Sequence, residues 1–161
     1  MEKRGADAIV IYCNSMAGAI NISEVRKRVS IPVITPHDVY REVAKKFDKI
    51  GVMAANCTST SNIEKAIVNS NPNATVIGYA NLDIVNDIER GGKPKQIVEK
   101  HGVDKFANII DKNNIKAIIL GCTHFPYFYK EIQKRTSAKV IEPSEEILKI
   151  LSKNLHLERN I

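Results

Sequence analysis

Short apolar runs alternate with longer amphipathic segments along the whole chain, and this alternation restricts the fold more than any other feature. The apolar runs cover residues 8–12, 31–34, 49–54, 75–79, 116–120 and 140–141. They are apolar at consecutive positions rather than at every second position, which is typical of strands buried on both faces. We therefore predict an α/β fold in which parallel sheets are covered by helices.

Several segments between these runs carry signals for helices. The run Thr35-Pro36-His37-Asp38 combines an N-cap residue, a proline at the first helical position and an acidic residue that completes a capping box. Ser61-Asn62-Ile63-Glu64 has the pattern of a second capping box, which predicts a helix from there to about residue 70. We also expect residues 17–29 and 95–112 to be helical.

Composition and charge exclude several classes of protein. The chain has 161 residues, of which 43% are hydrophobic and 26% charged, as in ordinary globular domains. No apolar run approaches the roughly 18 residues that span a bilayer, and the charged N-terminus lacks the apolar core of a signal peptide. We therefore expect a cytoplasmic protein without membrane contact. The net charge of +6 is scattered over single residues and pairs, which favours a small anionic ligand over nucleic acid.

The three cysteines, Cys13, Cys57 and Cys122, are too few and too dispersed for a disulfide framework. No Cys-x-x-Cys pair indicates zinc, and His37 and His101, which we expect on helix surfaces, have no metal-ligand spacing around them. We therefore expect free thiols and no metal site.

Two of the predicted strand ends resemble each other. Residues 6–14 and 115–123 each form an apolar strand that stops at a cysteine, Cys13 or Cys122, followed by a small polar residue and then a helix. A third strand end, residues 53–60, leads into a hydroxyl-rich loop suited to binding a carboxylate. Parallel α/β folds bind ligands at the carboxyl ends of their strands, so we expect these three ends to form a site.

The paired cysteines suit acid/base chemistry at a carbon atom. A thiol near a helix N-terminus has a lowered pKa, which makes a thiolate accessible near neutral pH. Moving a proton from one face of a carbon to the other needs two such groups, one on each side. The alternative interpretation is that both cysteines are core residues at strand ends. The polar neighbours Asn14, Ser15, Thr123 and His124 favour the functional interpretation, with His124 as proton partner or electrostatic tuner of the adjacent thiol.

At these residues the sequence resembles the aspartate/glutamate racemase superfamily. The run Gly121-Cys122-Thr123-His124-Phe125-Pro126 matches the second-cysteine motif of glutamate racemases, and Cys13-Asn14-Ser15 resembles the first-cysteine motif, which is usually Cys-Asn-Thr. Thr58 matches a threonine of the family's substrate loop, although Ala55 replaces another. Glu89 matches a glutamate near the second half of the family's active site.

This resemblance implies a racemase that needs neither pyridoxal phosphate nor a metal. Cys13 and Cys122 would exchange acid and base roles, with assistance from His124. The residues implied in holding the carboxylate and amino groups of an acidic amino acid are Asn14, Ser15, Thr58 and Thr123.

The resemblance also implies two pseudo-symmetric lobes, the first of them incomplete. Residues 1–37 and 138–161 would form the remainder of the first lobe, and residues 38–137 the second. The family's Asp-Ser-Gly strand, whose aspartate assists the first cysteine, has no counterpart before Asp7, and about two strand–helix units of roughly 30 residues each are missing. We therefore expect a homo-oligomer or a partner chain that covers the exposed sheet edge.

Two kinds of function are consistent with these features. The first is racemisation of glutamate, aspartate or a related acid, with hydantoin racemisation and maleate isomerisation as further reactions of the superfamily. The second is a catalytically silent, shortened paralogue that binds a small carboxylate.

Overall fold

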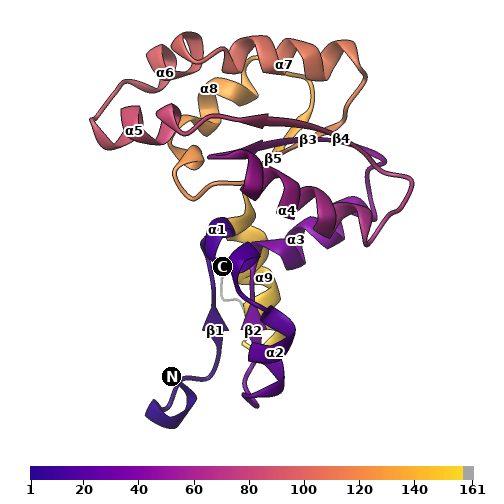
Figure 1. Ribbon diagram of the computed structural model, residues 1–161, viewed down its shortest axis with the longest axis vertical. Coiled ribbons are helices and arrows are strands. Elements are labelled where there is room, and N and C mark those ends of the chain that lie inside the picture. Colours follow the sequence, from indigo (N-terminus) through magenta and orange to yellow (C-terminus); the bar gives the residue numbers. More distant parts are fainter. Residues whose placement is uncertain (158–161) are drawn as a thin grey trace.

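The computed structural model describes residues 1–157 and contains two separate parallel sheets (Figure 1). The larger sheet has the strand order β4-β3-β5-β6. Its strands are β3 (Lys49–Ala54), β4 (Thr75–Ala80), β5 (Ala117–Leu120) and β6 (Lys139–Ile141). The smaller sheet pairs β1 (Ile9–Val10) with β2 (Val33–Ile34). The predicted α/β fold with parallel sheets is thus confirmed.

Helices cover both faces of the larger sheet. The α-helices are α1 (Asn14–Ala19), α2 (Ile22–Lys27), α3 (Pro36–Ala44), α4 (Cys57–Val68), α5 (Asp83–Glu89), α6 (Pro94–Lys100), α7 (Val103–Lys112), α8 (Tyr129–Gln133) and α9 (Pro143–Asn154), and the 3-10 helices are η1 (Glu2–Arg4) and η2 (Phe125–Phe128). Figure 1 shows α6, α7 and α8 on one side of this sheet and α3 and α4 on the other. None of the helices within residues 1–157 has the length and apolar character that crossing a membrane would require.

Alternate residues of the central strands build two apolar layers. On β5, Ile118 and Leu120 pack into the layer under α6 and α7, whereas Ala117 and Ile119 pack into the layer under α3 and α4. All four residues are fully buried. Burial on both faces explains why this strand is apolar at consecutive positions.

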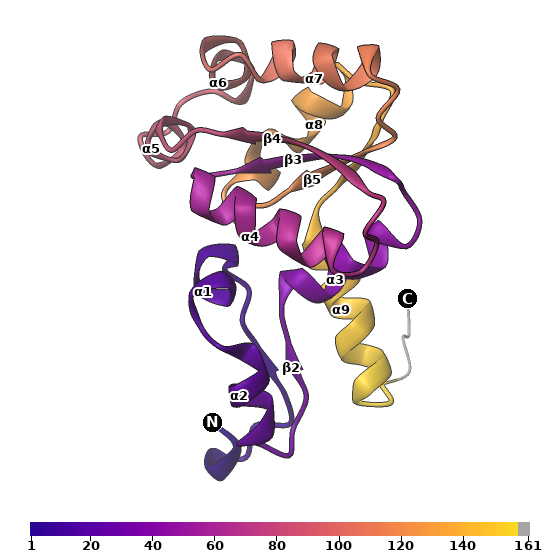
Figure 2. The ribbon, with the colours of Figure 1, turned by 45° about the vertical axis from the view of Figure 1, so that its right-hand side comes forward.

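The smaller sheet is more exposed than its sequence predicts. Residues 8–12 were expected to form a buried strand, yet Val10 is 38% exposed and Tyr12 is 37% exposed. The reason is that β1 pairs only with β2 among the described residues, so its other edge lacks a neighbouring strand. The C-terminal helix α9 packs against α3 and β2 (Figure 2).

The two capping predictions have different outcomes. The box at Thr35 and Asp38 is present at the start of α3, with the backbone N–H of Thr35 donating to Asp38 Oδ2 over 2.8 Å. The box predicted at residues 61–64 is wrong, because α4 already begins at Cys57. The side chain of Asn56 caps this helix by accepting a hydrogen bond from the backbone N–H of Ser59 over 2.8 Å.

Two predicted helices are divided, and two histidines are not on the surface. Residues 17–29 are interrupted where Ile20 adopts an extended backbone conformation, and residues 95–112 are interrupted by Gly102 at a φ of 70°. His37 is only 8% exposed, and the side chain of His101 is 7% exposed because it packs against α5 and hydrogen-bonds to Asp87.

The predicted division into lobes at residue 138 falls inside one sheet. β6 pairs with β5, with Ile118 opposite Val140 and Ile119 opposite Ile141. The four-stranded sheet therefore extends to residue 141, and only α9 returns toward the smaller sheet.

Candidate active site

The carboxyl ends of four strands are followed within three residues by a polar or thiol side chain. Cys13 follows the β1 segment, Asn56 follows β3, Cys122 follows β5 and Glu142 follows β6. Figure 2 shows α1 against the start of α4, which brings the segment carrying Cys13 to the edge of the larger sheet. The ends of β3 and β5 meet at one edge of the larger sheet, as parallel topology requires, and the contacts between α1 and α4 bring the β1 segment of the separate, smaller sheet beside them.

Three of the predicted site residues form a series of side-chain contacts at the larger sheet. The Cys122 Sγ atom lies 3.7 Å from Nδ1 of His124. The other ring nitrogen of His124, Nε2, lies 2.7 Å from Oε1 of Glu89 at the last residue of α5. When Glu89 accepts a hydrogen bond from Nε2–H, Nδ1 is left as an acceptor that faces the thiol. This arrangement can transfer a proton between Cys122 and the imidazole ring.

The pKa of Cys122 differs from the sequence-based expectation of a lowered value. Burial raises the pKa of this thiol, the backbone N–H of His124 lowers it, and the charge of Cys13 raises it further. The predicted helix after Cys122 is the four-residue 3-10 helix η2, which begins only at Phe125. So short a helix carries little macrodipole, and burial therefore outweighs it.

Cys13 lies on a segment whose side chains hydrogen-bond to two neighbouring helices, α3 and α4. Cys13 is exposed and occupies the N-cap position of α1. Asn14 is buried, and its Oδ1 accepts a hydrogen bond of 2.7 Å from the hydroxyl of Tyr40 on α3. The Ser15 hydroxyl lies 2.9 Å from that of Ser59 on α4. Cys13 is near enough to Cys122 for its charge to act on the pKa of that thiol.

The two predicted threonines lie near the N-termini of α4 and η2. Thr58 is exposed in the first turn of α4, and Thr123 is partly exposed directly after Cys122. The side chain of Asn56 satisfies only the N–H of Ser59, so N–H groups in the first turn of α4 remain for a carboxylate. Among residues 1–157, no group of three or more His, Cys, Asp or Glu side chains is arranged to hold a metal ion.

Sequence reasoning missed several polar residues beside Cys13. Tyr40 is fully buried, and burial raises the pKa of its hydroxyl far above the ordinary value, so this group remains a hydrogen-bond donor. Tyr12 donates a hydrogen bond of 3.1 Å to Oε1 of Glu142. No motif marks these residues, because their partners are far away in the sequence. The only sequence signal is that Tyr12 adjoins Cys13 and that Glu142 follows a predicted strand.

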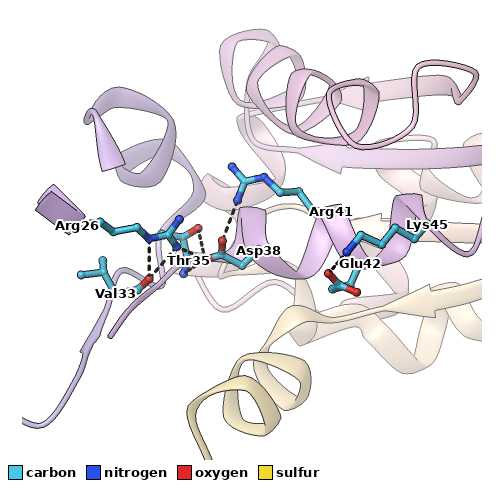
Figure 3. Close-up of polar contacts among 7 residues, drawn as sticks. All are labelled: Arg26, Val33, Thr35, Asp38, Arg41, Glu42 and Lys45. Carbon is cyan, nitrogen blue, oxygen red and sulfur yellow. Dashed lines mark hydrogen bonds and ion pairs between the residues drawn. The ribbon is translucent and has the colours of Figure 1, made fainter. Parts of the chain in front are cut away.

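A wide hollow of about 1070 Å³ lies away from both cysteines, between α2, β2, α3 and α9. Figure 3 shows how its charged side chains are connected. Arg26 donates to the carbonyl oxygen of Val33 over 2.8 Å and to Asp38 over 2.7 Å, and Arg41 lies 2.8 Å from the same carboxylate. Because Asp38 pairs with both arginines, this network serves to join α2, β2 and α3.

Comparisons with known proteins identify the family to which the chain is similar. The model of the Asp/Glu/Hydantoin racemase family matches residues 1–151. The chain is 30% identical over 146 residues to glutamate racemase of Limosilactobacillus reuteri (strain DSM 20016), covering 88% of this chain and 54% of the relative. It is 33% identical over 129 residues to glutamate racemase of Lactiplantibacillus plantarum, covering 78% of this chain and 46% of the relative. The chain thus spans about half the length of these curated relatives.

Solved structures show the same fold. A glutamate racemase isoform from Bacillus anthracis superimposes with a TM-score of 0.74 at 26% identity, covering 93% of this chain and 58% of that one. Glutamate racemase from Francisella tularensis, in complex with D-glutamate, also has a TM-score of 0.74, at 24% identity, covering 99% and 62% of the two chains. By its sequence, its fold and the match over residues 1–151, the chain belongs to the Asp/Glu/Hydantoin racemase family.

Proposed function

We propose that this chain carries the reaction centre of a cofactor-independent amino-acid racemase of the glutamate/aspartate type. The observation that carries the proposal is the series of side-chain contacts from Glu89 through His124 to Cys122. Cys13 is close enough to act electrostatically on the same thiol. The glutamate racemases among its relatives support an amino acid as substrate. A racemase needs no net redox change, and two thiols supply the acid and the base that it requires.

The two cysteines act from opposite faces of the substrate α-carbon. One thiolate accepts the α-proton and becomes a thiol, and the electron pair left on carbon is delocalised into the carboxylate. The other thiol then donates its proton to the opposite face and becomes a thiolate, which inverts the carbon. Burial keeps Cys122 in its thiol form at rest, so this residue becomes a base by first passing its proton to His124. Glu89 stabilises the imidazolium that results.

The substrate's acidic groups bind at the strand ends. The Tyr40 hydroxyl occupies Oδ1 of Asn14, which leaves the side-chain N–H₂ of Asn14 to donate to a carboxylate. Thr58 in the first turn of α4 and Thr123 after β5 supply hydroxyl donors, as does Ser15 on α1. The net charge of +6 favours the approach of an acidic amino acid.

We further propose that a second polypeptide surface covers the edge of β1. Within residues 1–157, the smaller sheet has two strands, an unpaired edge on β1 and an exposed apolar side chain at Val10, and such a sheet is marginal by itself. A second copy of the chain or a separate partner chain would complete this sheet. We place the protein in the cytoplasm, where a reducing environment keeps both thiols free.

Exchange of the α-proton tests the catalytic proposal directly. The chain is incubated in D₂O with L-glutamate, D-glutamate, L-aspartate and D-aspartate, and incorporation of deuterium is followed by mass spectrometry. We expect exchange with at least one enantiomeric pair, and its loss in Cys13→Ala and Cys122→Ala. Cys57→Ala removes the third thiol as a matched control and should retain exchange.

The outcomes separate an enzyme from a silent binding protein. Calorimetric binding of an acidic amino acid without any deuterium incorporation would establish the silent paralogue and refute the racemase. Equal loss of exchange in Cys57→Ala would also contradict the assignment of the acid/base pair. Size-exclusion chromatography with light scattering tests the open edge, since a stable and active monomer would contradict the covering surface.

A further inference from the structure

Each of the two candidate cysteines has a neighbouring ring that contacts a glutamate from a distant segment. Beside Cys122 this ring is His124, whose Nε2 lies 2.7 Å from Glu89. Beside Cys13 it is Tyr12, whose hydroxyl lies 3.1 Å from Oε1 of Glu142. The first pair belongs to the proposed proton path, whereas the second has no role in it.

The Glu142 carboxylate that contacts Tyr12 is itself fixed by further hydrogen bonds. Its Oε1 also accepts hydrogen bonds from the backbone N–H of Ser144 over 2.9 Å and from the Ser144 hydroxyl over 2.5 Å, because Glu142 is the N-cap residue of α9. The Tyr12 hydroxyl contacts the Ser144 hydroxyl as well. Burial raises the pKa of Tyr12, which keeps its hydroxyl protonated as a donor.

Three residues flanking Cys13 therefore attach this segment to three different helices. Tyr12 contacts the start of α9, Asn14 contacts Tyr40 on α3, and Ser15 contacts α4. Cys13 lies between these attachments. Of the three, only the link from Tyr12 reaches β6 of the larger sheet, because Glu142 follows that strand directly and β6 pairs with the strand that precedes Cys122.

The surroundings of Tyr40 bring these groups together. The pKa of the Tyr40 hydroxyl is raised first by burial and is affected by the charges of Glu142, Tyr12 and Cys122. The Tyr12–Glu142 pair and the thiol of Cys122 are thus all close enough to the Tyr40 hydroxyl, which donates to Asn14, to act on its pKa.

We propose that Tyr12 and Glu142 act as one unit that positions Cys13 against Cys122. The hydrogen bond between them attaches the exposed β1 segment to the edge of the larger sheet and sets the separation of the two thiols. This inference rests on the proposed racemase function for its catalytic consequence, but the positioning itself is measurable without turnover.

Two readouts on the full 161-residue chain test the unit. The first is the rate at which dibromobimane, a short bifunctional thiol reagent, joins Cys13 to Cys122, with the joined peptides identified by mass spectrometry. The second is deuterium exchange into L-glutamate. The variants are Tyr12→Phe, Glu142→Gln and the double variant. Glu145→Gln, which removes an exposed carboxylate from the same first turn of α9, is the matched control.

We expect both single variants to slow cross-linking and to lower kcat/KM for exchange roughly 10- to 100-fold, as a displacement of about 1 Å at a reacting group does. The double variant should lose no more than the more impaired single variant, because both substitutions break the same hydrogen bond. Glu145→Gln should match the wild type in both assays. Circular dichroism of each variant checks that the fold is retained.

Three results would overturn the inference. One is wild-type cross-linking in either single variant, and the second is a double variant whose loss equals the product of the two single losses. The third is a wild-type chain in which dibromobimane does not join Cys13 to Cys122. By contrast, a wild-type chain that cross-links but exchanges no acidic amino acid refutes the proposed function. Slower cross-linking in Tyr12→Phe and Glu142→Gln would then still support the positioning by these two residues.

Discussion

Replacing Gly121 with alanine tests whether the end of β5 must approach β3 as closely as the structure shows. The backbone N–H of Gly121 donates to the carbonyl oxygen of Met53 over 2.7 Å. A Cβ atom at position 121 would lie 2.9 Å from this same oxygen and would also clash with Ile63. The carbonyl belongs to the backbone and cannot rotate away, so the strand end itself has to move.

The expected cost follows from three contributions. Overpacking in a dense core costs about 1–3 kcal/mol. Weakening the hydrogen bond from Gly121 costs about 0.5–1.5 kcal/mol. Against these, alanine restricts the unfolded chain, which stabilises the protein by about 0.4–1 kcal/mol. We therefore expect Gly121→Ala to lower the free energy of unfolding by about 2 kcal/mol, which moves the urea midpoint by about 1 M if m is about 2 kcal/mol/M.

Gly51→Ala is the matched control on the neighbouring strand. Its added Cβ meets the Cδ1 atom of Ile110 at 2.6 Å, which is the far end of a flexible side chain rather than backbone. We expect this variant to remain within about 1 kcal/mol of the wild type, because rotation of Ile110 relieves the overlap. Urea unfolding followed by circular dichroism measures both variants.

The same substitution also reports on the site, because Gly121 precedes Cys122. Movement of the strand end should displace the thiol and reduce deuterium exchange by roughly 10- to 100-fold. A Gly121→Ala chain with wild-type stability would refute the close approach of β5 to β3. A destabilised chain with wild-type exchange would refute the dependence of the thiol's position on that strand end.

Three further predictions concern the two thiols and their surroundings. Glu89→Gln should lower exchange about 100-fold, as loss of assistance to an acid/base group does, and should leave the urea midpoint unchanged because Glu89 is 67% exposed; wild-type exchange would exclude Glu89 from the proton path. The rate of Cys122 alkylation by iodoacetamide should rise with pH and reach its midpoint above about 8.5, the ordinary thiol pKa, because burial raises the pKa of this thiol. An alkylation midpoint at or below about 8.5, measured by peptide-resolved mass spectrometry, would contradict the raised pKa of Cys122. Because this pKa is higher in the folded than in the unfolded chain, the contribution of the Cys122 thiol to stability is complete below the unfolded pKa and is lost as the pH rises through the folded pKa. Tyr40→Phe should lower the free energy of unfolding by about 1–3 kcal/mol, since Oδ1 of the buried Asn14 loses its donor, and an unchanged urea midpoint would refute that contact.

The elements that the sequence predicted correctly are those whose signals are local. β5 is apolar at consecutive positions because two core layers require it, and α3 begins where a threonine, a proline and an aspartate all favour a helix start. The errors arose where two local signals competed. Ser61-Asn62-Ile63-Glu64 has the pattern of a capping box, but Asn56 is an equally good cap and lies only two residues after the end of β3, so the helix begins earlier.

The polar contacts around the site depend on tertiary structure and leave little trace in the sequence. The partners Tyr12 and Glu142 are 130 positions apart, and Tyr40 and Asn14 are separated by 26 positions. Neither pair has a spacing that marks a contact. The raised pKa of Cys122 was unpredictable for a related reason, because its cause is burial among residues from several elements.

The two cysteines consequently differ in how much of the fold supports them. Cys122, His124 and Glu89 all belong to the larger sheet and its helices, and the strand before Cys122 is fully buried between two apolar layers. Cys13 follows a two-residue strand whose side chains are partly exposed and whose outer edge has no neighbouring strand within residues 1–157. Regions with few buried contacts open locally at lower free energy than the core does. The geometry of the thiol pair should therefore depend chiefly on what holds the Cys13 segment. For the proposed racemase, we expect the contacts of Tyr12, Asn14 and Ser15 with other elements, rather than the core around Cys122, to determine whether both faces of one carbon can be reached together.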